Sequence, residues 1–160
     1  GMLADTIDCV VLGYYRGQGK RSGFGIGAFL VGVIDNRHAE FSSASGDKKI
    51  LKQVQDDIKF VTVAKIGTGL SDEQWVTLEK ESSKLKVDEK PAEYDVHKGL
   101  VPDVWITPKI VVEIAADEIT KSPNHTAGVA LRFPRLMSFR DDKSPADATT
   151  VAEVEKLASF

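Results

Sequence analysis

Cysteine is almost absent from this sequence. Its single cysteine, Cys9, lies inside the apolar run IDCVVLGYY at positions 7–15. One cysteine can form neither a disulfide framework nor a cysteine-based zinc site, and the apolar surroundings favour a small buried hydrophobic residue over a reactive thiol. No carboxylate or cysteine stands at metal-ligand spacing from the three histidines, so we expect no metal site at His38, His97 or His125.

Long apolar runs are missing as well. No stretch approaches the roughly 18 to 20 apolar residues of a membrane span, and no charged segment followed by an apolar one opens the chain. We therefore expect a soluble, intracellular protein without membrane contact. The chain has 160 residues with 42% apolar content, enough for one domain with one core. Because Gly1 precedes Met2, residues 1–4 are interpreted as a tag remnant or linker and residues 5–160 as the domain.

Acidic residues are missing locally, although the whole chain has a net charge of -3. Residues 12–27 contain three cations and no acid: Arg16, Lys20 and Arg21. Residues 128–143 contain four cations against Asp141 and Asp142: Arg132, Arg135, Arg140 and Lys143. The acidic average argues against a protein that coats nucleic acid with its whole surface. Two basic segments on an acidic background instead predict a defined face for an anionic partner.

The glycine-rich segment GYYRGQGKRSGFGIGAFL at positions 13–30 lacks the features of a nucleotide-phosphate loop. A Walker loop needs Ser or Thr after its Gly-Lys pair, and here Arg21 follows. A dinucleotide-binding turn leads from a strand into a helix, whereas another strand pattern follows this segment. The segment therefore indicates a hairpin end that presents its cations to a phosphate backbone, or, alternatively, a hairpin whose cations only face solvent.

The remaining pattern predicts an all-β fold, a five-stranded Greek-key barrel of the OB type. Strand patterns cover 7–15, 25–34 and 59–67, and two longer extended stretches at 103–122 and 128–140 are interrupted by Pro108 and Pro134, so these strands should curve. Trp75 and Trp105 are expected to anchor the core. Residues 35–58 are polar and are interpreted as an exposed insertion.

Two helices are expected beside the strands. Ser71 and Gln74 form a capping-box pattern that predicts a helix between the third and fourth strands. Thr149 or Thr150 can cap a short C-terminal helix that ends near Leu157.

Three segments in order carry a family resemblance: 5–33 (DTIDCVVLGYYRGQGKRSGFGIGAFLVGV), 65–75 (KIGTGLSDEQW) and 130–154 (ALRFPRLMSFRDDKSPADATTVAEV). Together they closely resemble the C-terminal OB domain of ATP-dependent DNA ligases. In that family the stretch that reads RFPRLMSFRDDK here is nucleotidyltransferase motif VI, which closes with R-x-x-K. The resemblance implies that Arg140 and Lys143 face the β- and γ-phosphates of ATP during adenylation. It also implies that an aromatic from this barrel presses into the DNA minor groove, a role that falls to Phe133; strand alternation leaves open the alternative that Phe133 belongs to the core.

The family's nucleophilic lysine is missing. It belongs to a K-x-D-G motif, and the only similar stretch, KVDE at 86–89, lacks the glycine. The resemblance therefore implies a ligase fragment that is inactive alone and monomeric, and that works with the adenylation domain of the same chain. The family uses ATP and Mg²⁺ and acts on nicked duplex DNA, in the bacterial or archaeal cytoplasm or in the nucleus. The DNA-contacting residues it implies are Arg16, Lys20, Arg21, Arg132, Phe133 and Arg135. The alternative is a free-standing OB module that binds single-stranded DNA without a catalytic role.

Overall fold

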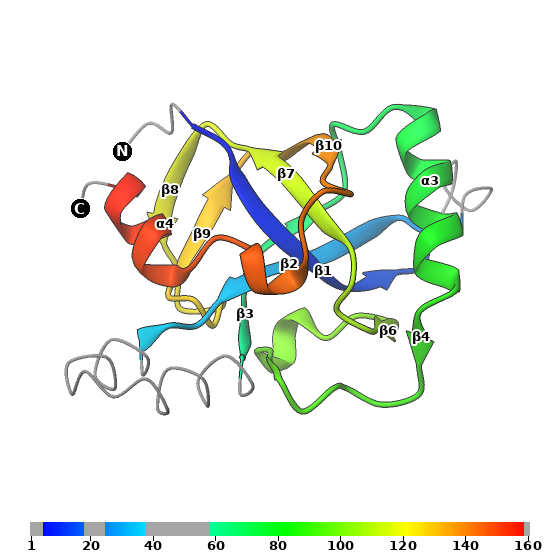
Figure 1. Cartoon of the computed structure of the whole chain (residues 1–160), viewed down its shortest axis with the longest axis horizontal. Coiled ribbons are helices and arrows are strands. Elements are labelled where there is room, and N and C mark those ends of the chain that lie inside the picture. The colour runs from blue at the N-terminus through cyan, green and yellow to red at the C-terminus, as the bar shows by residue number, and fades with distance from the viewer. Residues whose placement is uncertain (1–4, 18–24, 38–57, 159–160) are drawn as a thin grey trace.

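The architecture is a curled antiparallel sheet with two helices (Figure 1). The computed structural model describes residues 5–17, 25–37 and 58–158. Residues 1–4 and most of the predicted insertion at 35–58 lie outside these ranges. Within the described residues no helix is long and apolar enough to cross a membrane.

Three long strands form the centre of the sheet: β1 (Ile7–Tyr15), β2 (Ala28–Ile34) and β3 (Phe60–Ile66). Each pairs antiparallel with the next, and β1 also pairs with β7 (Val111–Ala115), which pairs with β10 (Arg135–Phe139). The sheet order is therefore β10-β7-β1-β2-β3.

Short strands complete the sheet around this centre. β4 (Lys86–Val87) pairs with β6 (Val104–Ile106), β6 pairs with β1, and β5 (Tyr94–Asp95) runs parallel to β3. A separate hairpin consists of β8 (Glu118–Lys121) and β9 (Val129–Arg132). It lies against β3 beyond the short pairing with β5, where the Ala127 N–H donates to the Thr62 carbonyl at 3.2 Å, and the sheet curls toward a barrel (Figure 1).

Both faces of the central strands are buried, which explains their nearly continuous apolar runs. Alternate residues of β1 enter two clusters: Cys9 and Val11 lie in the larger one, and Val10 and Leu12 in the smaller one. Each face thus keeps the period of two that a strand dictates. The buried position expected for Cys9 is confirmed, and burial raises the pKa of its thiol above the usual range.

The predicted helix between the third and fourth strands is present as α3 (Asp72–Ser83). Ser71 Oγ accepts from the Gln74 N–H at 3.2 Å, and the Gln74 side chain accepts from the Ser71 N–H at 3.0 Å, so the predicted capping box is confirmed. Trp75 projects from α3 into the larger cluster and meets Phe29 edge to face at 6.2 Å. Trp105 lies half-buried against the smaller cluster.

The C-terminal helix is present as α4 (Val151–Ala158), preceded by the single turn η3 (Pro145–Asp147); a second such turn is η2 (Lys98–Leu100). Thr150 caps α4 reciprocally with Glu153, because Thr150 Oγ1 accepts from the Glu153 N–H at 3.2 Å and the Thr150 N–H donates to Glu153 Oε1 at 3.1 Å. The α4 axis lies beside the β8–β9 hairpin (Figure 1).

Prolines divide the two long extended stretches, as the sequence predicts. Pro108 separates β6 from β7, and Pro134 separates β9 from β10. Phe133, just before Pro134, has a φ of 53°, so the chain turns sharply there and passes from the small hairpin back to the main sheet. The predicted all-β OB class with its two helices is confirmed, with each long stretch divided into shorter strands.

Candidate functional site

The R-x-x-K residues follow directly on strand β10. The Arg140 N–H donates to the Val111 carbonyl of β7 at 2.8 Å, and the Lys143 N–H donates to the Arg140 carbonyl at 3.1 Å. The second bond closes a tight turn, which folds the chain so that the Arg140 and Lys143 side chains lie on the same side. The structure therefore brings together two cations that are three residues apart in sequence.

Both cations meet one carboxylate from the first strand. Lys143 Nζ lies 2.6 Å from Asp8 Oδ2, and Arg140 Nη1 lies 3.4 Å from Asp8 Oδ1. Arg140 also makes a two-pronged contact with Asp142, through Nε and Nη2 at 3.1 Å each. The fork geometry of the guanidinium suits this bidentate pairing.

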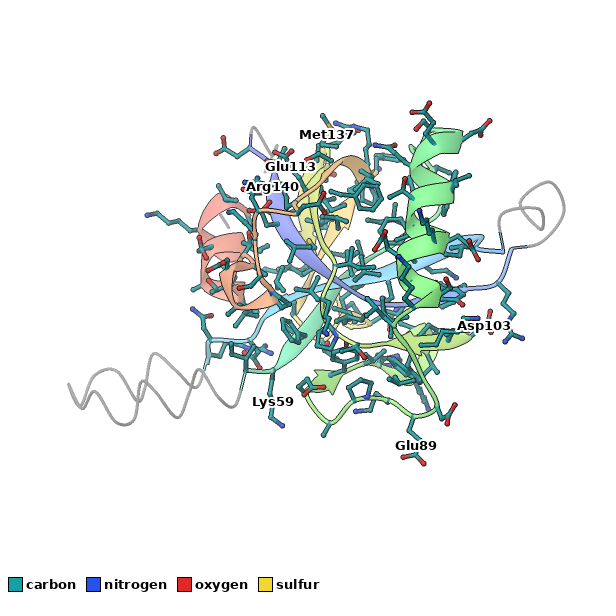
Figure 2. The ribbon with its side chains drawn as sticks, turned by 45° about the vertical axis from the view of Figure 1, so that its right-hand side comes forward. Lys59, Glu89, Asp103, Glu113, Met137 and Arg140 are labelled. Carbon is teal, nitrogen blue, oxygen red and sulfur yellow. The ribbon has the colours of Figure 1, made fainter. Side chains whose placement is uncertain are left out.

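A third carboxylate lies opposite Asp8 on the neighbouring strand. Glu113 of β7 is the cross-strand partner of Asp8, and Figure 2 shows it next to Arg140. Hydrogen bonds from Thr6 and Ser138, and then the charges of Arg140 and Lys143, lower the pKa of Glu113 below its usual value. Asp8 and Asp142 thus hold the two cations in place by pairing, whereas Glu113 makes no direct contact with them and only adds a nearby negative charge.

The same pairing shifts the pKa of the groups in the turn. The hydrogen bond to Asp142 raises the pKa of Arg140, and the bond from Arg140 lowers the pKa of Asp142. Both groups therefore stay charged across the ordinary pH range. Beside them a cleft runs between the end of α3 and the turn, and its rim adds Lys84 and Lys109.

The predicted DNA-contacting residues near Pro134 lie together in the turn between β9 and β10. Arg132 pairs with Glu118 and Arg135 with Asp117, each at 2.8 Å. The Arg132 guanidinium also lies 5.3 Å from the centre of the Phe133 ring. Both arginines are thus paired with carboxylates at the start of β8, Glu118 and the preceding Asp117. The sequence alone did not predict these pairs.

Phe133 is not a core residue. Its side chain is 63% exposed, and Met137 of β10 is exposed as well (Figure 2 labels Met137 at the same end of the molecule as Arg140). The alternative that strand alternation buries Phe133 is therefore wrong, because the positive φ at this residue rotates it out of the strand pattern. A large apolar side chain held in a strained backbone conformation and left exposed is a feature that indicates a function.

The first hairpin lies elsewhere. The Arg16 N–H donates to Asp103 Oδ2 at 2.8 Å, and Arg16 lines a small cleft with Glu79 of α3 and Lys86 of β4. Figure 2 shows Asp103 well separated from Arg140, so the structure does not bring Arg16 to the R-x-x-K turn. Lys20 and Arg21 lie outside the described residues.

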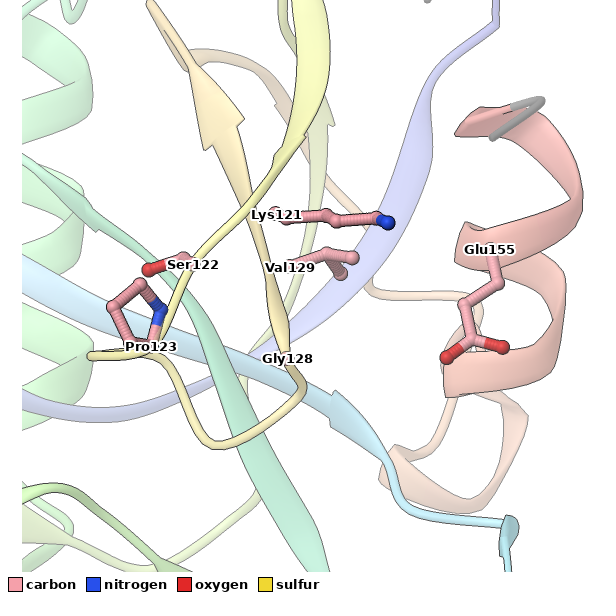
Figure 3. Close-up of a pocket in the computed structure, with 6 residues that line it drawn as sticks. All are labelled: Lys121, Ser122, Pro123, Gly128, Val129 and Glu155. Atoms are coloured by element: carbon pink, nitrogen blue, oxygen red, sulfur yellow. The ribbon is translucent and has the colours of Figure 1, made fainter.

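A further pocket lies between the β8–β9 hairpin and α4 (Figure 3). Figure 3 shows Lys121 extending from β8 toward Glu155 of α4 across this pocket. Ser122 Oγ, on its rim, lies 2.8 Å from His125 Nδ1 and also accepts from the Asn124 N–H. Because all three residues belong to one hairpin loop, we interpret the Ser–His contact as a turn-stabilising bond. Burial lowers the pKa of His125.

Asp8 is the main residue that the sequence analysis missed in this site. The only signal was a charge at the second position of a strand that is otherwise apolar, IDCVVLGYY. Glu113, Asp117 and Glu118 were missed for the same reason: each interrupts an extended apolar stretch, and its hydrogen-bond partners lie elsewhere in the sequence.

The curled sheet with its two helices defines an OB-type domain, and the R-x-x-K turn follows its last strand. Residues 22–143 match the family model described as "ATP dependent DNA ligase C terminal region", and the chain belongs to this family. A "Probable DNA ligase" from Dictyoglomus turgidum is 48% identical over 98% of this chain and 25% of its own length. The chain thus spans about a quarter of that relative.

Solved structures show the same fold. The ligase domain of LigD from M. tuberculosis aligns over 91% of this chain and 38% of its own chain, with a TM-score of 0.62 and 22% identity. A mycobacterial DNA ligase D complexed with ATP and MES aligns over 91% of this chain and 37% of its own, with a TM-score of 0.54 and 23% identity. At these identities the likeness supports the OB fold alone.

Proposed function

We propose that this domain forms part of a longer ATP-dependent DNA ligase that seals nicks in duplex DNA. In the first step AMP passes from ATP to a lysine outside this chain and pyrophosphate leaves. In the second step AMP moves to the 5′-phosphate at the nick, and in the third the 3′-hydroxyl displaces AMP. Such phosphoryl transfers depend mainly on positioning and on cations placed where charge develops.

The observation that carries the proposal is that Arg140 and Lys143 both contact the carboxylate of Asp8, at 3.4 and 2.6 Å from its two oxygens. Two cations that converge on a carboxylate present the charge and the spacing that phosphate oxygens require. Their role is to contact the β- and γ-phosphates of ATP when the domain closes on the adenylation domain. Because these phosphates leave as pyrophosphate, the contacts serve the first step and not the next two.

Mg²⁺ accompanies ATP in this proposal. Within the described ranges no three side chains from His, Cys, Asp and Glu come together as a metal site. The carboxylates near Arg140 are instead occupied by cationic side chains.

The second role of the domain is to bind duplex DNA in the sealing steps, through Arg132, Phe133 and Arg135 of the β9–β10 turn and through the first hairpin. Arg132 and Arg135 are exposed and each has one carboxylate partner, so each can exchange that partner for a DNA phosphate. A single-strand-binding module is less consistent with this surface, since such modules stack successive bases on several aromatics. Among the described residues, Phe133 is the one aromatic side chain that is largely exposed.

The proposal is tested by measuring the two kinds of step separately in the full-length enzyme. Arg140→Ala and Lys143→Ala should each slow single-turnover self-adenylation by roughly a hundredfold, because a charged transition-state contact of about 3 kcal/mol is lost. Sealing of a nick that already carries AMP should change much less. The control is Lys20→Ala with Arg21→Ala, for which we expect the reverse preference. Equal losses in both steps for Arg140→Ala would contradict the proposed division of roles.

A further inference from the structure

Asp8 occupies a fixed position at the beginning of β1. Its N–H donates to Thr149 Oγ1 and its carbonyl accepts from the Thr149 N–H, both at 2.9 Å. Thr149 directly precedes the cap of α4, so Asp8 is attached both to the sheet, through its pairing with Glu113, and to the C-terminal segment. Its side chain is only 13% exposed. The carboxylate therefore has little freedom to move.

The two oxygens of this carboxylate serve different cations. Oδ2 accepts from Lys143 and Oδ1 from Arg140, so Asp8 bridges the pair. Arg140 has a second carboxylate partner in Asp142, whereas the ammonium of Lys143 binds Asp8. The lysine stem has four rotatable bonds and a compact charge, so its position depends on what the ammonium binds.

Asp8 also offsets the repulsion between the two cations. Without a shared anion, two positive groups held by one tight turn would move apart into solvent, and ordering them again would cost side-chain entropy. Glu113 adds a negative charge on the neighbouring strand, but its carboxylate accepts hydrogen bonds from Thr6 and Ser138 rather than from the cations. Among the described carboxylates, Asp8 is therefore the one that contacts both cations.

We propose that Asp8 is a positioning residue for adenylation: it holds Arg140 and Lys143 as a pre-organised pair at the spacing in which they meet the departing phosphates. This inference rests on the proposed function of the pair. Catalytic groups that are already in place need no reorganisation at the moment of reaction, so the benefit appears in the rate of the adenylation step.

The experiment replaces the carboxylate with an amide of the same shape in the full-length enzyme. Asp8→Asn should lower the maximal rate of single-turnover self-adenylation about tenfold, with the ATP concentration at half-maximal rate changed less than threefold. Sealing of a pre-adenylated nick should stay within twofold of the parent. Asp8→Glu keeps the charge and should recover part of the rate. The matched control is Glu113→Gln, which removes a neighbouring negative charge without a contact to the pair and should stay within twofold in both steps.

Three outcomes would overturn the inference. Unchanged or faster adenylation in Asp8→Asn would mean that the carboxylate only competes with phosphates. Equal losses in adenylation and sealing, with a lower melting temperature, would mean a merely structural role, and an equal loss in Glu113→Gln would mean a general charge effect. If Arg140→Ala and Lys143→Ala slow adenylation while Asp8→Asn does not, only this inference fails. If the Arg140 and Lys143 variants leave adenylation intact, the proposed function itself fails.

Discussion

The two ends of strand β10 carry cations that are paired with carboxylates in different ways. Near its beginning, Arg132 at the end of β9 and Arg135 at the start of β10 are 57% and 46% exposed and have one carboxylate partner each. At its end, Arg140 and Lys143 are 28% and 32% exposed and share Asp8, and Arg140 is also held by Asp142.

In the proposed function, this difference would separate two ways of binding phosphate. An exposed ion pair contributes little to stability, so Arg132 or Arg135 can leave its partner for a DNA phosphate at small cost. The pair at the other end is instead held in position by carboxylates before any phosphate arrives. We infer that the beginning of the strand suits DNA, which can slide along exposed cations. Its end suits the departing pyrophosphate, which must be bound in one geometry.

The largest effect on the difference between the two ends of β10 is expected at Phe133. Phe133→Ala should lower the rate of nick sealing about tenfold, because an aromatic contact with nucleic acid contributes about 1–3 kcal/mol and 1.4 kcal/mol corresponds to a factor of ten. Adenylation should be unaffected, since the ring lies at the other end of β10 from Arg140. Rates of both steps in the full-length enzyme check this.

Phe133→Gly is the matched variant, because it removes the same ring and also relieves the positive φ of 53°. Its free energy of unfolding should be about 1 kcal/mol higher than that of Phe133→Ala, since a left-handed conformation costs a residue with a Cβ about that much. Chemical denaturation of the two variants separates the contribution of the ring from that of the backbone. A sealing rate equal to the parent's in both variants would remove Phe133 from the DNA interface.

Local patterns in the sequence predicted much of this fold. The capping boxes at Ser71 and at Thr150 were predictable because each is closed by a residue three positions away. The bends at Pro108 and Pro134 were predictable because proline cannot continue a ladder. In each case the relevant interaction depends on neighbours in the sequence.

Apart from Asp142, which is two residues from Arg140, the carboxylate partners were not predictable, because they depend on how distant strands align. Asp8 is 132 and 135 residues from its two cations, and Glu118 is 14 from Arg132. Alternation alone also misplaced Phe133 as a possible core residue, since nothing in the tripeptide Arg-Phe-Pro announces a positive φ. The cations could therefore be identified from the sequence, whereas their partners Asp8, Asp117 and Glu118 on other strands could not.

A smaller effect is expected in the salt dependence of duplex DNA binding. Arg132→Ala and Arg135→Ala should each make the slope of log K against log salt less steep by about one unit, since each phosphate contact releases counterions. Glu118→Gln is the control: it removes the partner of Arg132 and should strengthen binding at low salt. For Lys20→Ala with Arg21→Ala we expect a change of about one to two units. A slope equal to the parent's would show that the substituted cations do not contact DNA.

The smallest effect concerns acid stability at the Arg140 end. The pKa of Glu113 lies below its usual value of 4.5 in the folded chain, chiefly because Thr6 Oγ1 donates to it at 2.7 Å. A carboxyl whose pKa is lowered by folding stabilises the folded state above its ordinary pKa, and this stabilisation is lost as the pH falls through the folded-state value. The free energy of unfolding of the parent should therefore decrease more steeply below about pH 4.5 than that of Glu113→Gln. Thr6→Val keeps the carboxyl but removes its strongest partner, so its acid limb should lie between the two. Denaturation curves recorded from pH 6 downward would contradict this account if all three proteins lost stability with the same slope.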